Sequence, residues 1–593
     1  MHTSGQTVMQ IVRCFRLNPL RLFVLAIVLL ATAKLFLHQR SSGAEMVVVK
    51  LQKEQPHLPE KDQDWFWGNS HGSDTVNDES KKALPPEPPH EERAGAMSDS
   101  SGGSKRAVAK DFSQKQMKLV HLDLKGAAPK VSYFEQVFPL FAKLGANGLL
   151  IEYEDMFPFQ GELEILRSPY AYSEEDIEKI LHLAQINGLE VVPLVQCFGH
   201  MEFVLKHDKY KHLREVEKYP NSLNPHAAET LPLVTSILRQ VLDRHPQNKW
   251  FHIGADEVFY LGEGHDSKTW MNSNNGDMGK MYLNHIQAVI SFLIASYKEI
   301  QVLMWDDMLR RIKMETIQES GIMDHAAPMI WLYEADMDTN QISQYITKYQ
   351  NSGFKTVWFA SAFKGASGVA QVLTPMDKHQ KNHRGWLQMF QKMKDFPRIH
   401  LQGIALTGWQ RYDHFSALCE LLPMGIPSLA VCLQTLVHGV FSQQAQRNIL
   451  EMLGFKEIDV SKNICIGNGA FPGSEIYRLV EQIQRELKPK VDSILKDNEI
   501  IHGWFSRYHR KHRFGNPYKM ERFGSKVLKS HEELETLIQQ LRQQLEAVYF
   551  PDTVEEWMEE FVNPYMDPLR EFVKDYQEII KLNAQPKASL KRL

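Results

Sequence analysis

Short apolar runs rich in Val, Ile and Leu recur eight times along this chain, each separated from the next by a helical pattern. They lie near residues 119–122, 148–151, 190–195, 250–253, 302–304, 329–332, 356–359 and 403–406. Buried strands that alternate with crossover helices are typical of a parallel sheet covered by helices. Eight repeats predict an α/β fold, a closed (β/α)₈ TIM barrel over residues 116–440. A doubly wound open sheet is the alternative, but no Gly-rich phosphate turn follows the first run.

The local signals around residues 173–195 show the pattern of one repeat. Ser173 with Asp176 three residues later predicts a capping box at a helix start. Asn187-Gly188 predicts the end of that helix, and an apolar run follows. After about residue 440 no strand pattern recurs, so residues 441–593 are predicted to form a helical C-terminal region. Two helical stripes support this prediction: Ile476, Leu479, Val480, Ile483 and Leu487, then Leu534, Leu537, Ile538, Leu541, Leu545 and Val548.

The N-terminal part has a different composition. We expect residues 1–18 to form a tail. Residues 19–37 are apolar over a length that is just enough to cross a bilayer, which predicts a transmembrane signal-anchor. Ala31-Thr32-Ala33 has the A-x-A pattern of a signal-peptide cleavage site, so a removed signal peptide is the alternative. Residues 38–115 are polar and rich in Pro and Ser, which predicts a disordered stem. We therefore expect contact with the lipid bilayer through residues 19–37.

This anchor predicts a single-pass type II membrane protein whose catalytic domain is luminal, in the Golgi or secretory pathway. The chain has only five cysteines among 593 residues and contains no Asn-x-Ser/Thr acceptor, which both oppose a luminal address. If the N-terminal segment is not used, a soluble cytoplasmic or nuclear protein is the alternative.

The net charge of −4 gives no basic field for nucleic acid. The cysteines form no CxxC, and no metal-ligand spacing such as HExxH occurs, so no metal site is predicted.

Polar and aromatic side chains follow most of the predicted strands at their carboxyl ends, where TIM barrels carry their chemistry. The candidate sugar-binding residues are Asp123, Glu152, Gln196, His200, Trp305, Tyr333, Trp409, Tyr412 and Asp413, and the candidate catalytic residues are Asp256 and Glu257. Carboxylates, amides and aromatic rings on one face suit a sugar, because hydroxyls need acceptors and a pyranose face packs on an indole ring.

The adjacent acids Asp256 and Glu257 indicate the class of mechanism. A conventional retaining glycosidase needs carboxylates on opposite sides of the anomeric carbon, about 5 Å apart, and two successive residues cannot easily flank a ring. They can approach from one side. One acid can then protonate the leaving oxygen while the other orients a 2-acetamido group whose carbonyl oxygen attacks. We expect Asp256 to stay ionised and to keep Glu257 protonated.

The run His252-Ile253-Gly254-Ala255-Asp256-Glu257 resembles the signature of glycoside hydrolase family 20, the β-N-acetylhexosaminidases. The stretches 119–123, 196–200 and 407–414 are also similar to this family, and the resemblance covers residues 117–565. It implies retaining, substrate-assisted exo-hydrolysis of terminal non-reducing β-linked N-acetyl-D-hexosamine from glycoconjugates, without a cofactor. It further implies that Glu257 is the acid/base, Asp256 holds the acetamido nitrogen, and His200 supports the acid. Trp409 would wall the acetamido pocket, with Trp305 as a second wall.

The chain departs from the family pattern at two positions. Lys118 stands where an arginine usually grips sugar hydroxyls, and residues 361–364 replace a tyrosine that donates to the acetamido oxygen. Tyr333 or Tyr412 could supply that hydroxyl. The departures motivate an alternative, a catalytically weak or inactive glycan-binding or scaffold protein tethered to a membrane. A homodimer is a further expectation.

Overall fold

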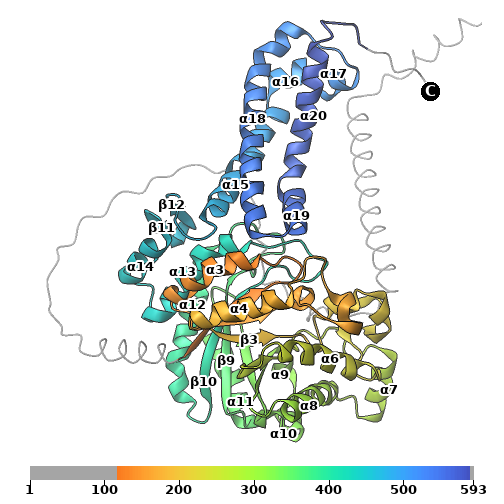
Figure 1. Ribbon diagram of the computed structural model, residues 1–593, viewed down its shortest axis with the longest axis vertical. Helices are drawn as coiled ribbons and strands as arrows, with labels where there is room; N and C mark the ends of the chain where they lie inside the picture. The colour runs from red at the N-terminus through yellow and green to blue at the C-terminus, as the bar shows by residue number, and fades with distance from the viewer. Residues whose placement is uncertain (1–115, 588–593) are drawn as a thin grey trace, which may run out of the picture. The chain divides into compact units, whose positions relative to one another are not determined.

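The computed structural model describes residues 116–587 (Figure 1). The predicted tail, membrane segment and stem, residues 1–18, 19–37 and 38–115, lie outside the described residues, so these predictions and the bilayer contact stay untested. Between residues 116 and 587, no helix is both long enough and apolar enough to cross a membrane.

Eight parallel strands close into a barrel, which confirms the predicted fold class. They are β1 (Met117–Asp123), β2 (Gly148–Glu152), β3 (Glu190–Leu194), β6 (Trp250–His252), β7 (Gln301–Trp305), β8 (Ala326–Trp331), β9 (Thr356–Lys364) and β10 (His400–Gly408). The spatial order is β1-β10-β9-β8-β7-β6-β3-β2, with β1 also paired to β2. Each strand overlaps one of the eight predicted apolar runs, and three of the runs, those at β3, β6 and β8, extend one residue past the strand end.

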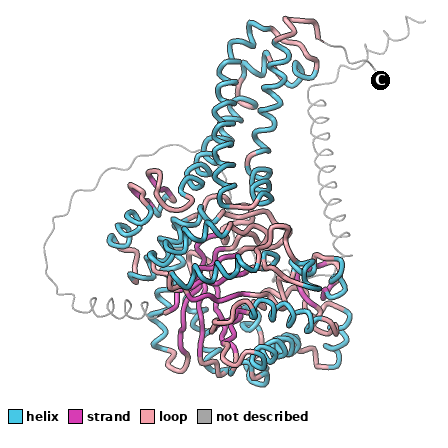
Figure 2. Tube along the Cα trace, in the orientation of Figure 1, coloured by secondary structure: helices cyan, strands magenta, loops and turns pink. Residues whose placement is uncertain are grey.

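Helices cover the outside of the barrel, and Figure 2 shows the strands enclosed by them. They are α3 (Val131–Leu144), α4 (Glu174–Ile186), α5 (Glu202–Leu205), α6 (Thr230–Asp243), α7 (His265–Ser273), α8 (Met278–Ser296), α9 (Asp307–Arg311), α10 (Met314–Ser320), α11 (Thr339–Ser352), α12 (Met376–Lys392) and α13 (Leu422–His438). The predicted capping box at Ser173 is present at the start of α4, with both reciprocal hydrogen bonds made.

The barrel interior is a packed core rather than a channel. A cluster of buried side chains fills it, separate from the larger core between strands and helices. Trp250 and Trp358 meet edge to face there, with ring centroids 5.2 Å apart. This filling leaves the carboxyl ends of the strands as the open face on which polar side chains can meet.

Two small hairpins were not predicted. β4 (Arg214–Val216) and β5 (Tyr219–Leu223) form an antiparallel pair in the segment between β3 and β6. β11 (Glu457–Asp459) and β12 (Ile464–Ile466) form another, so the expectation that no strand follows residue 440 is wrong for these six residues. Strands of three residues are too short to show an alternating pattern in sequence.

The C-terminal region is otherwise helical, as predicted. It contains α14 (Gln443–Leu453), α15 (Ser474–Leu495), α16 (Glu499–Trp504), α17 (Arg507–Lys511), α18 (Pro517–Val548), α19 (Pro551–Phe561) and α20 (Asn563–Ile580). The long helices α15, α18 and α20 pack side by side (Figure 1). Both predicted apolar stripes, on α15 and α18, are buried.

The helical region contacts the barrel at the carboxyl-end loops. The Lys130 amide donates to the Val548 carbonyl at 2.7 Å, and the buried Tyr549 hydroxyl accepts from the Leu422 amide at 3.1 Å. Arg411, two residues after Trp409, binds both carboxylate oxygens of Glu556 on α19 at 2.7 and 3.1 Å. The loop that follows β10 is therefore braced from outside the barrel.

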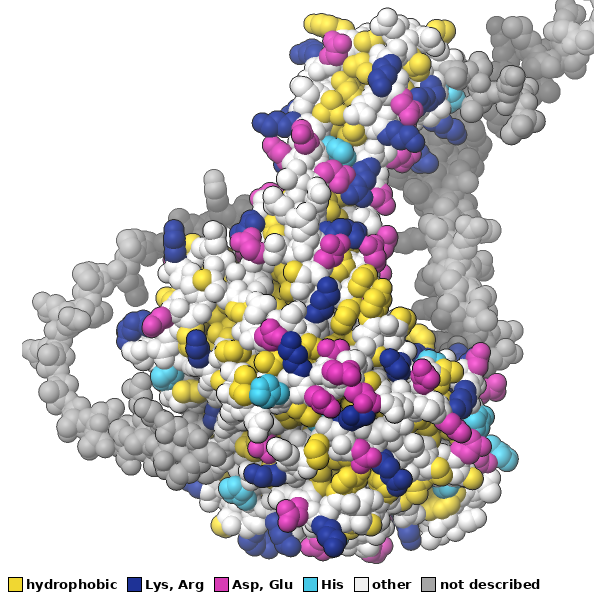
Figure 3. Space-filling view, viewed as in Figure 1, with side chains coloured by type: hydrophobic (Ala, Val, Ile, Leu, Met, Phe, Trp, Pro, Cys, Tyr) yellow, Lys and Arg dark blue, Asp and Glu magenta, His cyan; other side chains and the backbone are white. Residues whose placement is uncertain are grey.

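On the face in Figure 3, positive and negative side chains are interspersed without a patch of one sign.

We expect Glu556→Ala to lower the free energy of unfolding by about 2 kcal/mol, because it strips a buried guanidinium of its charged acceptor. Glu559→Ala, on the exposed side of the same helix, is the matched control and should cost less than about 0.5 kcal/mol. Chemical denaturation of both variants measures the difference. Equal effects would show that the ion pair does not stabilise this contact.

Candidate active site

Asp256 and Glu257 lie in the loop that follows β6, at the carboxyl end of the barrel. The loop has an unusual backbone: φ is +63° at Gly254, +69° at Ala255 and +45° at Glu257. His200, in the loop after β3, has φ of +51°. Positive φ is costly for residues with a side chain and persists where surrounding contacts enforce it. Several residues with a strained backbone therefore lie in the loop of the acid pair and at the histidine that contacts it.

Four hydrogen bonds hold this acid loop in place. The Ala255 amide donates to Gln196 Oε1 at 3.2 Å, and the Ala255 carbonyl accepts from the Tyr282 hydroxyl at 2.8 Å. The Gly254 carbonyl accepts from the Trp305 amide at 3.0 Å. The Glu257 amide donates to Asp307 Oδ2 at 3.0 Å. Contacts from β3, α8, β7 and α9 thus fix the backbone on both sides of the acids.

Two glycines allow the loops after β3 and β6 to touch. A Cβ at Gly199 would clash with the backbone carbonyl of Asp256, and one at Gly254 would clash with the Gln196 side chain. The close approach brings His200 Nε2 to 2.9 Å from Glu257 Oε2 and 3.5 Å from Asp256 Oδ2. The predicted support of Glu257 by His200 has this direct contact as its structural basis.

The two acids differ in exposure. The Asp256 side chain is 9% exposed, against 18% for Glu257 and 16% for His200. Asp256 Oδ1 is buried and has no hydrogen-bond partner among the described residues. Asp256 therefore presents an unused acceptor below the surface, while Glu257 reaches closer to solvent. The contacting nitrogen and carboxylate oxygens lie within 4.8 Å of one another, a donor set that could also hold a divalent cation.

The electrostatics of the site oppose the expectation that Asp256 stays ionised. Burial raises the pKa of Asp256 to about 8, and the nearby Asp307 and Glu257 carboxylates add to this, while His200 opposes it. Burial disfavours charge on His200, but Asp256 and Glu257 together raise the pKa of His200 well above its ordinary value. Burial thus makes Asp256 hold its proton more tightly than an exposed aspartate would.

Asp307 is a second buried acid at the site, and the sequence did not single it out as a site residue. Burial, followed by repulsion from Glu257, raises the pKa of Asp307 to about 6. Its neighbour Asp306 binds the Arg310 guanidinium through both oxygens at 2.6 and 2.7 Å and accepts from the Tyr349 hydroxyl at 2.7 Å. Asp306 is therefore structural, whereas Asp307 acts electrostatically on the acid pair.

Aromatic side chains lie at the same end of the barrel as the acids. Trp305 and Trp409 lie 6.1 Å apart between ring centroids, and the Trp409 indole donates to the Tyr333 hydroxyl at 3.3 Å. Trp305 Nε1 is buried without a hydrogen-bond partner among the described residues. Burial raises the pKa of Tyr333, and the Asp256 and Glu257 charges contribute. Tyr333 is thus a neutral hydroxyl near the acid pair.

Three predicted sugar ligands lie below the acid loop with their polar atoms already bonded. Asp123 accepts from Lys125 Nζ at 2.9 Å and from the Gln410 amide at 2.7 Å. Glu152 contacts His121 Nε2 at 3.3 Å and accepts from Gln196 Nε2 at 3.2 Å. All three predicted ligands, Asp123, Glu152 and Gln196, are buried. This geometry favours positioning of the loops, since direct sugar contact would break these bonds.

The two remaining predicted ligands lie in the turn after β10. The Asp413 carboxylate accepts from the Phe415 amide at 2.8 Å, so it stabilises its own turn. Burial, with nearby Cys419, raises the pKa of Tyr412 to about 12. The Tyr333 hydroxyl contacts the Trp409 indole, which places Tyr333 beside the predicted wall of the acetamido pocket.

A lysine at this face was missed in the sequence. Lys125 is buried, with Nζ 2.9 Å from Asp123 and 5.3 Å from the centroid of Trp409. Its place two residues after a strand-end aspartate was the available signal. Lys118 lies instead at the amino end of β1, where its Nζ donates to the Gln116 carbonyl at 3.0 Å. It is therefore far along the strand from the acid loop.

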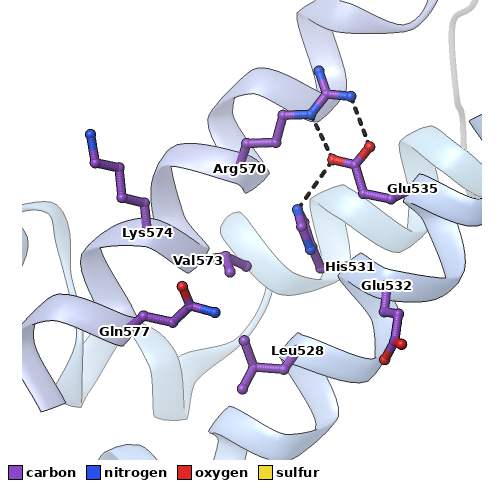
Figure 4. A pocket seen from close by; sticks show the side chains of 8 residues that line it. All are labelled: Leu528, His531, Glu532, Glu535, Arg570, Val573, Lys574 and Gln577. Atoms are coloured by element: carbon purple, nitrogen blue, oxygen red, sulfur yellow. Dashed lines mark hydrogen bonds and ion pairs between the residues drawn. The ribbon is translucent and has the colours of Figure 1, made fainter. Parts of the chain in front are cut away.

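Two hollows on the described surface lie away from the acid pair. One, of about 450 Å³, lies between α18 and α20, where Arg570 binds Glu535 through both oxygens and His531 contacts the same carboxylate (Figure 4). The other lies between α12 and β11. Neither is lined by Asp256 or Glu257, so neither is a candidate for the catalytic site.

Comparison with known proteins identifies the family of this chain. Residues 139–365 match the family model of the glycosyl hydrolase family 20 catalytic domain. Hexosaminidase D from Homo sapiens is 47% identical over 464 residues, 78% of this chain and 95% of that protein. Hexosaminidase D from Bos taurus is 53% identical over 58% of this chain and 98% of that protein. A solved β-N-acetylhexosaminidase from Bacteroides fragilis aligns at 14% identity and a TM-score of 0.41, over 55% of this chain and 66% of that one.

The barrel and its acid pair define a glycoside hydrolase. The relatives make the class specific: the chain belongs to glycoside hydrolase family 20 and is a β-N-acetylhexosaminidase, which hydrolyses terminal N-acetylhexosamine.

We expect kcat/KM to rise with pH as Asp256 loses its proton, because the ionised carboxylate binds an amide N–H more strongly than the neutral acid and stabilises positive charge on its nitrogen. Asp307→Asn should move this rising limb to lower pH, since it removes a negative neighbour that raises the pKa of Asp256. The asparagine oxygen can still accept from the Glu257 amide. The control is Asp243→Asn on α6. A limb that stays in place, or moves to higher pH, would contradict the electrostatic role of Asp307.

Proposed function

We propose that this enzyme cleaves its substrate by a retaining, substrate-assisted mechanism in which Glu257 is the acid/base and Asp256 holds the acetamido group. The single observation that carries the proposal is the unequal placement of two adjacent acids. Asp256 offers a buried oxygen without a partner among the described residues, while Glu257, bonded to His200, faces solvent more openly.

In the first step, the acetamido carbonyl oxygen forms a bond to the anomeric carbon as the glycosidic C–O bond breaks. Glu257 transfers its proton to the departing oxygen, so the leaving group departs neutral. The acetamido nitrogen gains positive charge in the resulting oxazolinium ring. Asp256, once ionised, accepts the N–H hydrogen bond and stabilises that charge at short range.

In the second step, the Glu257 carboxylate removes a proton from water, and the oxygen of that water bonds to the anomeric carbon. The bond from the carbonyl oxygen to that carbon breaks, which restores the acetamide. Two displacements at the same carbon retain its configuration. His200, held 2.9 Å from Glu257, orients the carboxylate in both steps.

The aromatic residues supply the walls of the acetamido pocket. Trp305 and Trp409 would exclude water from the methyl group, and Tyr333 would donate its hydroxyl to the acetamido oxygen in place of the family's usual tyrosine. The position of Tyr333 at the Trp409 indole supports this assignment. Confining the acetamide raises the effective concentration of its oxygen at the anomeric carbon.

Glu257→Gln should lower kcat/KM for a sugar leaving group by about 10²- to 10⁴-fold, because the amide cannot protonate the glycosidic oxygen. The loss should be smaller for a dinitrophenyl leaving group, which departs without a proton. Glu263→Gln, an exposed acid in the same loop, is the matched control. Undiminished turnover by Glu257→Gln would disprove the acid assignment. Absence of turnover in the parent would favour a glycan-binding protein.

A thiazoline mimic of the bicyclic intermediate should bind at least about 100-fold more tightly than substrate, because it resembles the state that the site stabilises. Asp256→Asn should lose most of this affinity, since the carboxylate charge is removed. Inhibition constants measure the effect, and NMR of fresh product should show the β-anomer first. Weak inhibition, or the α-anomer first, would contradict participation of the acetamido group.

A further inference from the structure

Phe259 is an exposed ring in a segment that is otherwise largely buried. Residues 250–256 and Val258 are buried, yet Phe259 is 36% exposed. Exposure of a single phenylalanine on a surface is common. Its position, two residues after the proposed acid Glu257 at the open end of the barrel, is what sets it apart.

The backbone that carries Phe259 is fixed in place. Its amide donates to the Glu257 carbonyl at 2.7 Å and to Asn221 Oδ1 on β5 at 3.3 Å. Further along the loop, Glu215 on β4 accepts from the amides of Gly262 and Gly264 at 2.9 and 3.0 Å. The ring is therefore presented to solvent by a loop bound along its length.

The hairpin β4–β5 adds a stacked aromatic pair behind this loop. Tyr260 stacks on Tyr219 of β5 with centroids 4.1 Å apart and planes 11° from parallel. Glu215 also accepts from the Ser267 hydroxyl at 2.9 Å, so both of its oxygens are occupied. The hairpin thus acts as a rigid support for residues 258–264.

The ring lies next to the histidine that contacts the proposed acid. Phe259 meets His200 edge-on, with centroids 6.4 Å apart, and His200 binds Glu257. The glycosidic oxygen must reach the Glu257 carboxyl to receive its proton. β6, which precedes Phe259, lies across the barrel from β10, which carries the Trp409 wall. Phe259 and the Trp409 wall of the acetamido pocket therefore lie at opposite sides of the barrel mouth.

We propose that Phe259, supported by the Tyr219–Tyr260 stack, is a binding subsite for the ring of the leaving group. Its ligand class is a pyranose or an aromatic aglycone, either of which packs a flat face on the exposed phenyl ring. The subsite rests on the proposed role of Glu257 as the acid, and it extends recognition beyond the terminal N-acetylhexosamine.

The test compares three β-N-acetylhexosaminides with the purified full chain: a disaccharide, the 4-nitrophenyl glycoside and the glycosyl azide, whose leaving group has no ring. Phe259→Ala should lower kcat/KM for the two ring-bearing substrates by about three- to tenfold and leave the azide unchanged. Phe259→Trp should keep the preference. The inhibition constant of free N-acetylhexosamine should not change, because that sugar fills only the acetamido side.

Tyr518→Ala, an exposed aromatic on α18, is the control and should leave all three substrates unaffected. An equal loss on all three substrates, or weaker inhibition by free N-acetylhexosamine, would show that Phe259 only supports the acid loop and would overturn the subsite. Unchanged turnover of the ring-bearing substrates would overturn it too. Failure of the proposed mechanism is distinct, since it would appear as full activity in Glu257→Gln, whatever Phe259→Ala does.

Discussion

The contact between the loops after β3 and β6 is the constraint on which the site depends. It exists because Gly199 and Gly254 have no side chain where the opposing loop passes. A larger residue at either position would push the loops apart and separate His200 from Glu257. The strained φ values at Ala255, Glu257 and His200 are a consequence of the same contact, since ordinary backbone would not carry these residues to one point.

That contact also determines how protons are distributed. Two carboxylates and an imidazole are desolvated together, and Asp307 adds a third acid nearby. The two acids favour a cationic His200, while burial raises the pKa of Asp256. An acetamide N–H that enters the site favours the ionised form of Asp256, so substrate itself would help to expel that proton. The site therefore suits the charge that develops during the reaction better than it suits charged acids before the substrate binds.

The barrel could be predicted from the sequence because its signals are local. Apolar runs, a capping box at Ser173 and stripes on α15 and α18 each depend on residues close in the chain. The location of Asp256 and Glu257 followed from the rule that strand ends carry the chemistry. The hairpins β4–β5 and β11–β12 could not be predicted, because three of these strands have only three residues and β5 is short and polar with a proline at Pro220.

The raised pKa of Asp256 was equally out of reach, since it depends on how far the acid is buried and on neighbours such as Asp307 at the start of α9. The buried bonding of Asp123, Glu152 and Gln196 is a further example. Their residue types suit a sugar, and only the fold shows that other protein groups already occupy their polar atoms.

The proposed acid Glu257 and the proposed leaving-group subsite Phe259 lie in one short segment, residues 257–259. The Phe259 amide is bonded to the Glu257 carbonyl and to Asn221 of β5, so the hairpin positions both residues through the same backbone. A leaving group that packs on Phe259 would press on the segment that aims the acid. Binding of the leaving group and protonation of its oxygen are then coupled by geometry. Remote binding energy can thereby be used in the transition state, as efficient catalysis requires.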